Sequence, residues 1–444
     1  MNWQILLIIF FCSVSSDLEP LRDENLPYSP SRELNLDQFI IEPYQVEKKL
    51  AAVNPHKSAG PDDIPNWIWH EFAPWLAEPI CAIFNASIRQ GVVPPSWKRA
   101  NVVPIPKINP PVDLRADLRP ISLTPTLSKL LESFIGHWLL TEVYDKIDVK
   151  QFGALKGKST THELVDLLHH WHEALDKHAS VRALFVDYAK AFDHIDHIIV
   201  IQKLNDLKVS QVLVQWISSF LTDRQQRVKI SDVYSNWMTL RGGMPEGSFL
   251  GPLIFLIMIN DLTAQGLLYK FLDDVTLSET VVQGTRSCFN SSIEKIIVWS
   301  KLNHMNINWN KTKEMILGSV KDLIAQPLRV EDHDIQRVDS FKLLGLIIDS
   351  NLRWSKHVEF ICSKASQRLH YLKILKRSGL SIDDLLYFYC TVIRTILEYA
   401  CPAWHTNLTL EDTSCLEDVQ KRALSIIFGL GDYDDLCERA QLTT

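Results

Sequence analysis

Asp273 and Asp274 are adjacent carboxylates that separate two short segments rich in apolar and β-forming residues, 268–272 and 275–278. This pattern predicts a β-hairpin that carries both carboxylates at its turn. Neighbouring like charges repel, and burying one without a partner costs on the order of several kcal/mol. Carboxylate oxygens are hard ligands that suit Mg²⁺, so the pair indicates either a divalent-cation site or a solvated turn, where Asp is common.

Asp187 is a third carboxylate, and it directly follows residues 181–186, whose nearly unbroken apolar run is typical of a buried strand. Farther along, a glycine-rich loop over residues 242–252 leads into the apolar residues 253–259. Pro252 suits the first turn of the helix that this apolar run predicts. A strand that ends in Asp, a glycine-rich loop before a buried helix and an Asp–Asp hairpin follow one another, which favours the cation site.

In this order, the three features resemble the palm of a reverse transcriptase, and more specifically that of the non-LTR (LINE-type) retrotransposons. The resemblance covers most of the chain from about Lys57 onward. It implies an α+β right-hand polymerase fold with fingers, a palm made of an antiparallel sheet and helices, and a helical thumb.

The resemblance also divides the 444 residues into parts. Residues 1–43 are expected to form a leader with a signal-like apolar segment, and residues 44–175 an N-terminal extension and the fingers. The palm is expected at 176–350 and a helical thumb with a C-terminal remnant at 351–444, with the reverse transcriptase core at about 87–348. Neither an endonuclease before the fingers nor a Cys/His cluster after the thumb is recognisable, so we expect a polymerase truncated at both ends.

By resemblance, Asp187 and Asp273 bridge two Mg²⁺ ions, with Mn²⁺ as a possible substitute, and Asp274 helps to ligate one of them. Such ions stabilise the attacking and leaving oxygens of an in-line displacement. Lys311, in the turn of a predicted helix–turn–strand over residues 296–316, is a candidate proton donor to the leaving pyrophosphate. That role needs only reach and a modest pKa shift, and a solvated turn lysine is the alternative.

Lys107 and Arg119 are implied by the same resemblance to reach the incoming triphosphate. Arg binds phosphate oxygens through a bidentate fork, and structural ion pairing is the rival role. Phe192 occupies the position where the family carries a bulky residue beneath the sugar of the nucleotide. An aromatic ring there leaves no room for a 2′-hydroxyl and so favours deoxynucleotides, whereas plain core packing is its alternative.

Glu246 departs from the family pattern, which has Gln before the Gly247-Ser pair near the nucleotide. A carboxylate there faces a polyanion, and like charges about 5 Å apart at an effective dielectric of about 20 cost roughly 3 kcal/mol. That cost corresponds to a loss of more than about a hundredfold in turnover, unless a nearby Lys offsets it. A second departure is Leu272, whose side chain is larger than the common Ala and is expected to crowd the primer end.

The net charge of −7 argues mildly against a nucleic-acid partner, because phosphate contacts need Lys and Arg. A locally basic run near the C-terminus offsets this argument, although a solvated helix face would look the same. The eight cysteines include no Cys-x-x-Cys pair, which fits reduced thiols better than a disulfide scaffold or a zinc site. The basic run consists of Arg353, Lys356, Lys364, Arg368, Lys373, Lys376 and Arg377.

Residues 5–14 are apolar and precede Ser15 and Ser16, a pattern similar to a signal peptide, although no Lys or Arg precedes them. The run is too short to span a bilayer as a helix, so no stable membrane partner is expected. A secreted polymerase would lack nucleotides and template. A polymerase is therefore expected inside the cell, in the nucleus or the cytoplasm. The signal-like residues 5–14 conflict with this expected location.

Together these features predict an RNA-directed DNA polymerase that extends a DNA primer with deoxynucleoside triphosphates. The RNA template follows from the resemblance alone. Two alternatives remain open: an inactive retrotransposon relic that only binds nucleic acid, and a secreted binding protein led by residues 5–14.

Overall fold

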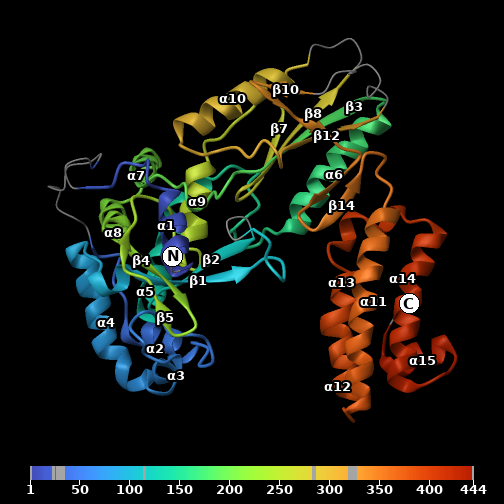
Figure 1. Ribbon diagram of the computed structural model, residues 1–444, viewed down its shortest axis with the longest axis horizontal. Helices are drawn as coiled ribbons and strands as arrows, with labels where there is room; N and C mark the ends of the chain where they lie inside the picture. The colour runs from blue at the N-terminus through green and yellow to red at the C-terminus, as the bar shows by residue number, and fades with distance from the viewer. Residues whose placement is uncertain are drawn as a thin grey trace.

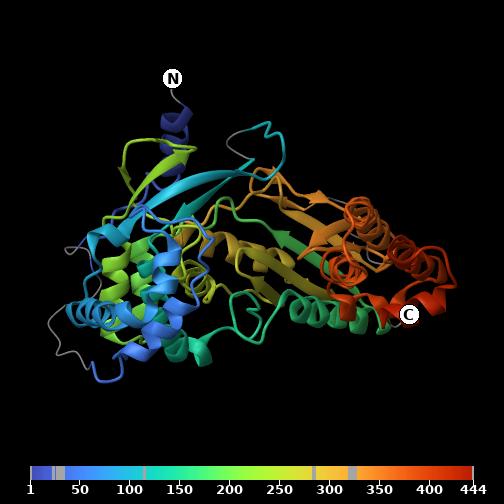
Figure 2. The same ribbon diagram turned by 90° about the horizontal axis from the view of Figure 1, so that it is seen from below.

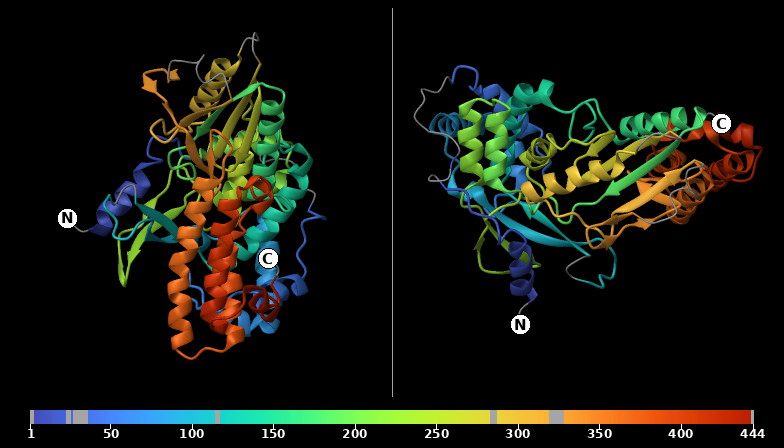
Figure 3. Two further views of the ribbon diagram at one scale, coloured as in Figure 1. Left: turned by 90° about the vertical axis from the view of Figure 1, so that its right-hand side faces the viewer. Right: turned by 90° about the horizontal axis from the view of Figure 1, so that it is seen from above.

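The computed structural model of the chain describes residues 3–22, 26, 36–113, 117–282, 287–318 and 328–442. Its elements form three parts that follow an arch in Figure 1. The N-terminal lobe combines helices with a small sheet, a central sheet follows, and the C-terminal bundle is helical. Figure 2 and Figure 3 show the central sheet between the lobe and the bundle from other sides.

The small sheet of the N-terminal lobe has the strand order β2–β1–β4–β5, and β6 also pairs with β4. β1 pairs antiparallel with β2 and parallel with β4, so Val102 lies opposite both Ser122 and Val228. Because side chains alternate along strands, the sheet has two distinct faces, and Val102 and Val228 are buried on one of them. The strands are β1 (Arg99–Pro106), β2 (Leu118–Leu123), β4 (Gln225–Ile230), β5 (Val233–Tyr234) and β6 (Met238–Thr239).

Helix α1 (Trp3–Ser13) packs on the apolar face of this sheet, as Figure 2 shows for the navy helix near the N-terminus. Leu7, Phe11 and Cys12 are buried there with Val102 and Val228. The segment expected to be a signal-like leader thus forms a helix with a packing partner in the sheet.

The helices of the N-terminal lobe share one apolar core with α9 (Leu250–Ile259). Every α9 residue except Pro252 is buried, as is typical of a helix that is apolar on all sides. The neighbouring helices are α2 (Pro43–Ala51), α3 (Asn66–Glu71), α4 (Ala73–Gln90), α5 (Thr126–Val143), α7 (His197–Asp206) and α8 (Gln211–Leu221).

The central sheet has the strand order β12–β9–β3–β8–β7, with β3 (Ser180–Val186) in the middle. β3 is buried along its whole length, as its apolar run predicts. Its alternate side chains face two cores: Val181 and Phe185 pack with α6, whereas Leu184 and Val186 pack with α9 and α10. The other elements are α6 (Thr160–Asp176), β7 (Leu267–Phe271), β8 (Asp274–Val281), α10 (Phe289–Leu302), β9 (Lys313–Leu317), β10 (Arg329–Val330), β11 (His333–Asp334) and β12 (Gln336–Arg337).

The hairpin of β13 (Ser340–Leu343) and β14 (Leu346–Asp349) leads into the C-terminal bundle. In α11 (Ser355–Arg377) the buried residues recur every three or four positions and form one face, whereas the residues of the basic run are exposed. The remaining helices are α12 (Ile382–Phe388), a π-helix (Tyr389–Arg394), α13 (Thr395–Leu397), α14 (Leu410–Phe428) and α15 (Tyr433–Ala440).

All eight cysteines are free thiols, as the composition suggested. Within the described part of the chain, none of the helices has the length and apolar character needed to cross a membrane.

Candidate active site

The predicted hairpin is formed by β7 and β8, which close with the pair Phe271 and Asp274 and leave Leu272 and Asp273 at the turn. Leu272 has a left-handed φ of 56°, which costs a non-glycine residue roughly 1–2 kcal/mol. Gly153 lies in close contact with the turn, because a Cβ added to this glycine would lie 2.8 Å from Leu272 Cγ. The side chain of Leu272 therefore packs against the segment before α6.

Asp187 reaches the same place from the neighbouring strand. β3 ends at Val186, which pairs with Val275, so the next residue lies beside Asp274 across the sheet. The Oδ1 atom of Asp187 is buried and has no hydrogen-bond partner among the residues that the structure describes. An orphaned carboxylate oxygen of this kind indicates a place for a missing ligand, because leaving it unpaired costs on the order of 1–3 kcal/mol.

Burial and neighbouring carboxylates raise the pKa values of Asp273 and Asp274. Burial, followed by the charges of Asp273 and Asp187, raises the pKa of Asp274 to about 6. Burial and the charge of Asp187 also raise the pKa of Asp273. A divalent cation would reverse this effect by favouring the anions, so the donor set fits a hard cation such as Mg²⁺.

The carboxylates do not surround one point as they stand. Within the described residues, no three His, Cys, Asp or Glu side chains are placed so that they could hold a metal ion together. A shared ion therefore requires these side chains to turn toward one another.

Lys311 lies next to this group, with its Nζ 3.8 Å from Asp187 Oδ1. Burial raises the pKa values of Asp187 and Asp273, and the charge of Lys311 offsets part of this rise. Asp187, Asp274 and Lys311 line a cavity of about 320 Å³ between the central sheet and the β13 strand. Phe341 of β13 closes one side by stacking on Phe185 at 4.0 Å between ring centroids.

Lys107 and Arg119 face the carboxylates from the β1–β2 pair, where both side chains are exposed. The charge of Lys107 lowers the pKa of Asp187, and that of Arg119 lowers the pKa of Asp273. The structure therefore brings two cations from the N-terminal lobe within electrostatic range of the acidic group in the central sheet.

Glu246 lies between these two sets of charges. Burial raises its pKa, whereas Arg119 and Lys107 lower it. The loop is fixed to β2, because the Ser122 N–H donates to the Glu246 carbonyl at 2.7 Å. Gly247 has a φ of 117°, and a Cβ there would lie 2.9 Å from the Ser122 carbonyl oxygen, so the loop needs glycine at this point.

A family model described as reverse transcriptase (RNA-dependent DNA polymerase) matches residues 105–348. The chain belongs to the reverse transcriptase family. Its fold is the α+β right-hand polymerase fold predicted from the sequence. The expected boundaries of fingers, palm and thumb stay predictions.

Transposon proteins are among the relatives of this reverse transcriptase. It is 26% identical over 390 residues to a probable RNA-directed DNA polymerase from transposon X-element of Drosophila melanogaster, covering 84% of the chain and 42% of the relative. It is also 26% identical over 375 residues to the RNA-directed DNA polymerase from mobile element jockey of Drosophila funebris, covering 80% of the chain and 40% of the relative. The chain thus spans about two fifths of these relatives, whose names agree with the non-LTR resemblance.

Among solved structures, a telomerase from Candida albicans matches with a TM-score of 0.40 and 11% identity, covering 84% of this chain and 65% of the telomerase chain.

Phe192 of the reverse transcriptase lies between the glycine-rich loop and α9. Its ring stacks on Phe255 at 5.0 Å between centroids, and its carbonyl accepts a hydrogen bond from the Met244 N–H. The ring remains partly exposed, so both its core role and a contact with a nucleotide sugar are compatible with its position.

A row of alternating cations and aromatic rings lies on one face of the small sheet, and we call it the basic–aromatic row. The guanidinium of Arg227 lies 4.0 Å from the ring of Tyr234 and 4.5 Å from that of Trp237. Arg99 also lies over Trp237, and Lys229 over Tyr234. The register puts Arg227 on the sheet face opposite to Val228 and α1. Rings and cations together are what single-stranded nucleic acids bind.

Glu163 is a buried carboxyl near the site that the sequence did not single out. It lies in α6 and is only 1% exposed. Neither carboxyl oxygen has a hydrogen-bond partner in the described part of the chain. Burial, followed by the charge of Asp274, raises its pKa to about 8, so Glu163 is largely protonated at neutral pH.

Proposed function

We propose that this chain is an RNA-directed DNA polymerase of a non-LTR retrotransposon, which adds deoxynucleotides to the end of a DNA primer on an RNA template. The observation that carries this proposal is that Asp187 lies beside Asp273 and Asp274 at the ends of adjacent strands, with the buried Oδ1 atom of Asp187 accepting no hydrogen bond from the described residues. The names of the transposon relatives support the same activity.

Asp187 and Asp273 would hold two Mg²⁺ or Mn²⁺ ions, with help from Asp274. When bound, the ions supply the charge that stabilises the attacking and leaving oxygens of an in-line displacement. The raised pKa values of Asp273 and Asp274 make cation binding and loss of their protons linked events.

The cations around the carboxylates would position the nucleotide. Lys107 and Arg119 would bind its triphosphate oxygens, and Lys311 would donate a proton to the leaving pyrophosphate. Phe192 would exclude a 2′-hydroxyl, and the backbone at Gly247 would approach the nucleotide closely. These contacts act mainly by orientation, which is the main contribution of protein to phosphoryl transfer.

The nucleic-acid partners would bind two basic surfaces. The basic–aromatic row would contact the unpaired template by stacking and by charge. The exposed cations of the basic run on α11 would contact the backbone of the primer–template duplex. Such substrates place the activity inside the cell.

Primer extension by the purified chain, with Mg²⁺ and an RNA template, tests this proposal. Asp273→Asn should reduce extension by more than about a thousandfold, because several kcal/mol of charge stabilisation is lost. Asp332→Asn, an exposed carboxylate in the turn after β10, is the matched control and should extend normally. Extension that persists in Asp273→Asn would contradict the proposal.

A second candidate function is that of a relic that binds nucleic acid without extending it. Two observations favour it: the carboxylates are not gathered around one ion, and Glu246 puts negative charge beside the nucleotide position. RNA binding by the wild type without any extension, in Mg²⁺ or Mn²⁺, is the result that would establish it.

A further inference from the structure

The buried helix α9 connects the two halves of the proposed active site. It starts directly after the glycine-rich loop that holds Glu246 and Gly247, and its end leads into β7 and the Asp273–Asp274 turn. A helix leaves N–H groups without partners at its start and carbonyls without partners at its end. Because α9 is buried, these groups need partners from the protein.

The start of α9 receives a carboxylate from a distant helix. Glu132 of α5 is fully buried, and its Oε2 accepts hydrogen bonds from the N–H groups of Phe249 at 2.8 Å and Leu250 at 3.3 Å. Its Oε1 accepts from the Ser128 hydroxyl at 2.9 Å. A negative charge at a helix N-terminus complements the helix dipole.

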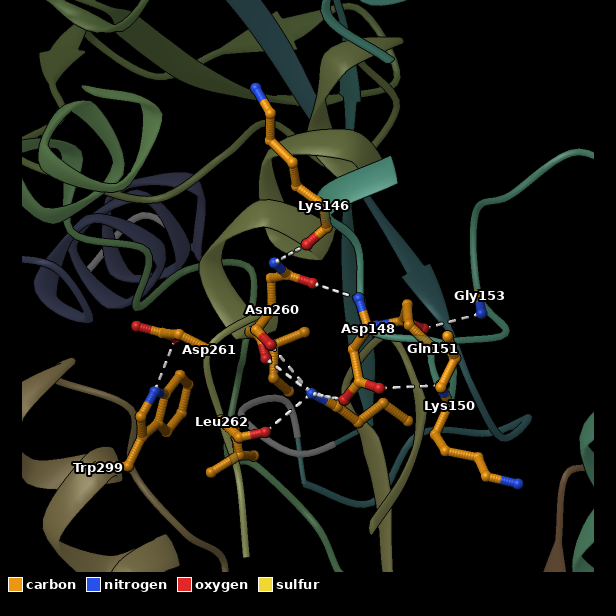
Figure 4. Close-up of polar contacts among 12 residues, drawn as sticks. Lys146, Asp148, Lys150, Gln151, Gly153, Asn260, Asp261, Leu262 and Trp299 are labelled. Atoms are coloured by element: carbon orange, nitrogen blue, oxygen red, sulfur yellow. Dashed lines mark hydrogen bonds and ion pairs between the residues drawn. The ribbon is translucent and has the colours of Figure 1, made fainter. Parts of the chain in front are cut away.

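The end of α9 receives an ammonium group from β7. Lys270 is fully buried, and its Nζ donates to the carbonyls of Leu262 at 2.8 Å, Asn260 at 3.2 Å and Ile259 at 3.4 Å. The same nitrogen pairs with Asp148 Oδ2 at 2.7 Å. Figure 4 shows Asp148, Asn260 and Leu262 around this contact.

The partners of Lys270 are themselves held in place. The Asp148 N–H donates to Asn260 Oδ1 at 2.8 Å, and Asn260 Nδ2 donates to the Lys146 carbonyl at 2.9 Å (Figure 4). The Lys270 N–H in turn donates to the Lys150 carbonyl at 3.0 Å. β7 is therefore joined to the end of α9 directly by the Lys270 side chain, and indirectly by its backbone bond to the segment 146–150, which itself bonds Asn260.

We propose that Lys270 is a positioning residue that locks β7 to the end of α9 and so fixes the Asp273–Asp274 turn relative to the glycine-rich loop. Glu132 holds the opposite end of the same helix. Lys270 lies three residues before Asp273, so a shift of β7 moves the proposed metal ligands without touching the loop at the other end. The kinetic consequences rest on the proposed polymerase function.

A matched control exists at the same end of α9. Lys203 of α7 is also buried, and its Nζ donates to the Met258 carbonyl at 2.6 Å and pairs with Asp261. Lys203→Met removes a buried ammonium from the end of α9, as Lys270→Met does, but leaves β7 untouched.

Steady-state primer extension separates the two lysines. Lys270→Met should lower kcat by about tenfold to a hundredfold, the cost of a small misplacement of reacting groups, with KM for the nucleotide within about twofold. Lys203→Met should leave kcat within about twofold of the wild-type value. Equal kcat values for the two variants would overturn the proposal.

A double variant distinguishes positioning from stability. Lys270→Met leaves the Asp148 carboxylate without its ammonium partner, and adding Asp148→Asn removes that half-buried charge and should restore much of the lost Tm. The kcat of the double variant should stay low, because β7 is still not joined to α9. Recovery of kcat together with Tm would show a merely structural role. If Lys270→Met does not fold, Asp148→Asn alone should lower kcat severalfold, and an unchanged kcat would contradict the proposal.

Hydrogen exchange tests the same connection without any activity. The amides of residues 271–275 should exchange faster in Lys270→Met than in Lys203→Met. Equal exchange would overturn the positioning role. Faster exchange in a protein that never extends a primer would uphold it and reject the polymerase function instead.

Discussion

Two groups of charges lie close together at the β7–β8 hairpin, and they differ in burial and in how well their hydrogen bonds are satisfied. At Lys270 the ammonium has three carbonyls and a carboxylate around it. Beside the turn, Asp187 Oδ1 accepts no hydrogen bond within the described residues, although Lys311 Nζ lies 3.8 Å away, and burial raises the pKa values of the Asp273 and Asp274 carboxyls.

This difference in hydrogen bonding distinguishes the residues that hold the fold from the residues that form the proposed binding site. Each unpaired buried polar atom costs on the order of 1–3 kcal/mol, so a fold retains it where a ligand completes it. Charges that are fully paired fix the geometry instead. The Asp273–Asp274 turn would then be a binding site whose unsatisfied groups destabilise the fold. The fully paired charges around Lys270 would hold this turn in position.

The largest expected effect comes from removing an unsatisfied charge. Asp187→Asn should reduce primer extension by more than about a thousandfold, because a proposed metal ligand is lost. Its Tm should stay equal or rise, because the substitution removes a partly buried anion whose pKa burial raises. Thermal unfolding and extension, measured on the same preparation, check both outcomes. A large fall in Tm would show that Asp187 stabilises the fold, as the fully paired charges around Lys270 do, and would contradict the comparison.

Glu246→Gln tests a carboxylate that cations partly compensate. The substitution should raise kcat/KM for the nucleotide by up to about tenfold, less than full repulsion would give, because Lys107 and Arg119 already offset the charge. Burial raises the Glu246 pKa, so the wild type is protonated more readily as pH falls and its disadvantage should shrink there. A ratio of variant to wild type that does not change between pH 6 and pH 8.5 would contradict this account.

Glu163→Gln should remove a pH dependence of stability. The folded-state pKa of about 8 exceeds the ordinary value of 4.5, so the folded protein keeps a proton that the unfolded chain releases between these values. Stability is therefore lost as pH rises through this window, by at most about 1.4 kcal/mol per pH unit. Thermal unfolding should show that Glu163→Gln raises Tm by several degrees at pH 8.5 and much less at pH 5. An equal change in Tm at both pH values would contradict the predicted direction of this pH dependence.

The smallest effect of a substitution is expected in the basic–aromatic row, where the cations contact aromatic rings and remain accessible to solvent. Arg227→Gln in the basic–aromatic row should weaken binding of single-stranded RNA severalfold and lower the slope of log K against log salt by about one. Arg439→Gln is the matched control, because it removes a cation on α15, at the far end of the C-terminal bundle, that lies 4.5 Å from the ring of Phe428 on α14. Fluorescence anisotropy at several salt concentrations measures both. Equal salt slopes would exclude the row from the RNA interface.

Local patterns predicted the parts of the site that depend on neighbours in sequence. The alternation around Asp273 predicted the hairpin, and the apolar run before Asp187 predicted a buried strand. The family resemblance added Lys107 and Arg119, which lie in electrostatic range of those carboxylates. These features can be predicted because each depends on about a dozen consecutive residues.

Other parts depend on contacts between distant residues and left no local signal. Glu132 and Phe249 are 117 positions apart, so no window of sequence predicts that they meet. Lys270 reads as an ordinary strand residue, and the packing of α1 on the small sheet contrasts with the signal-like composition of that segment. The single available clue was a charged residue inside an apolar strand, as at Lys270, because such a charge needs a buried partner.

Metal binding without catalysis tests the central claim most directly. Mn²⁺ titrated into the wild type and followed by electron paramagnetic resonance should show saturable binding, with loss of that binding in both Asp187→Asn and Asp273→Asn and its retention in Asp332→Asn. Binding that survives in the two active-site variants, or that is absent from a folded wild type, would contradict the assignment of these carboxylates as the cation site.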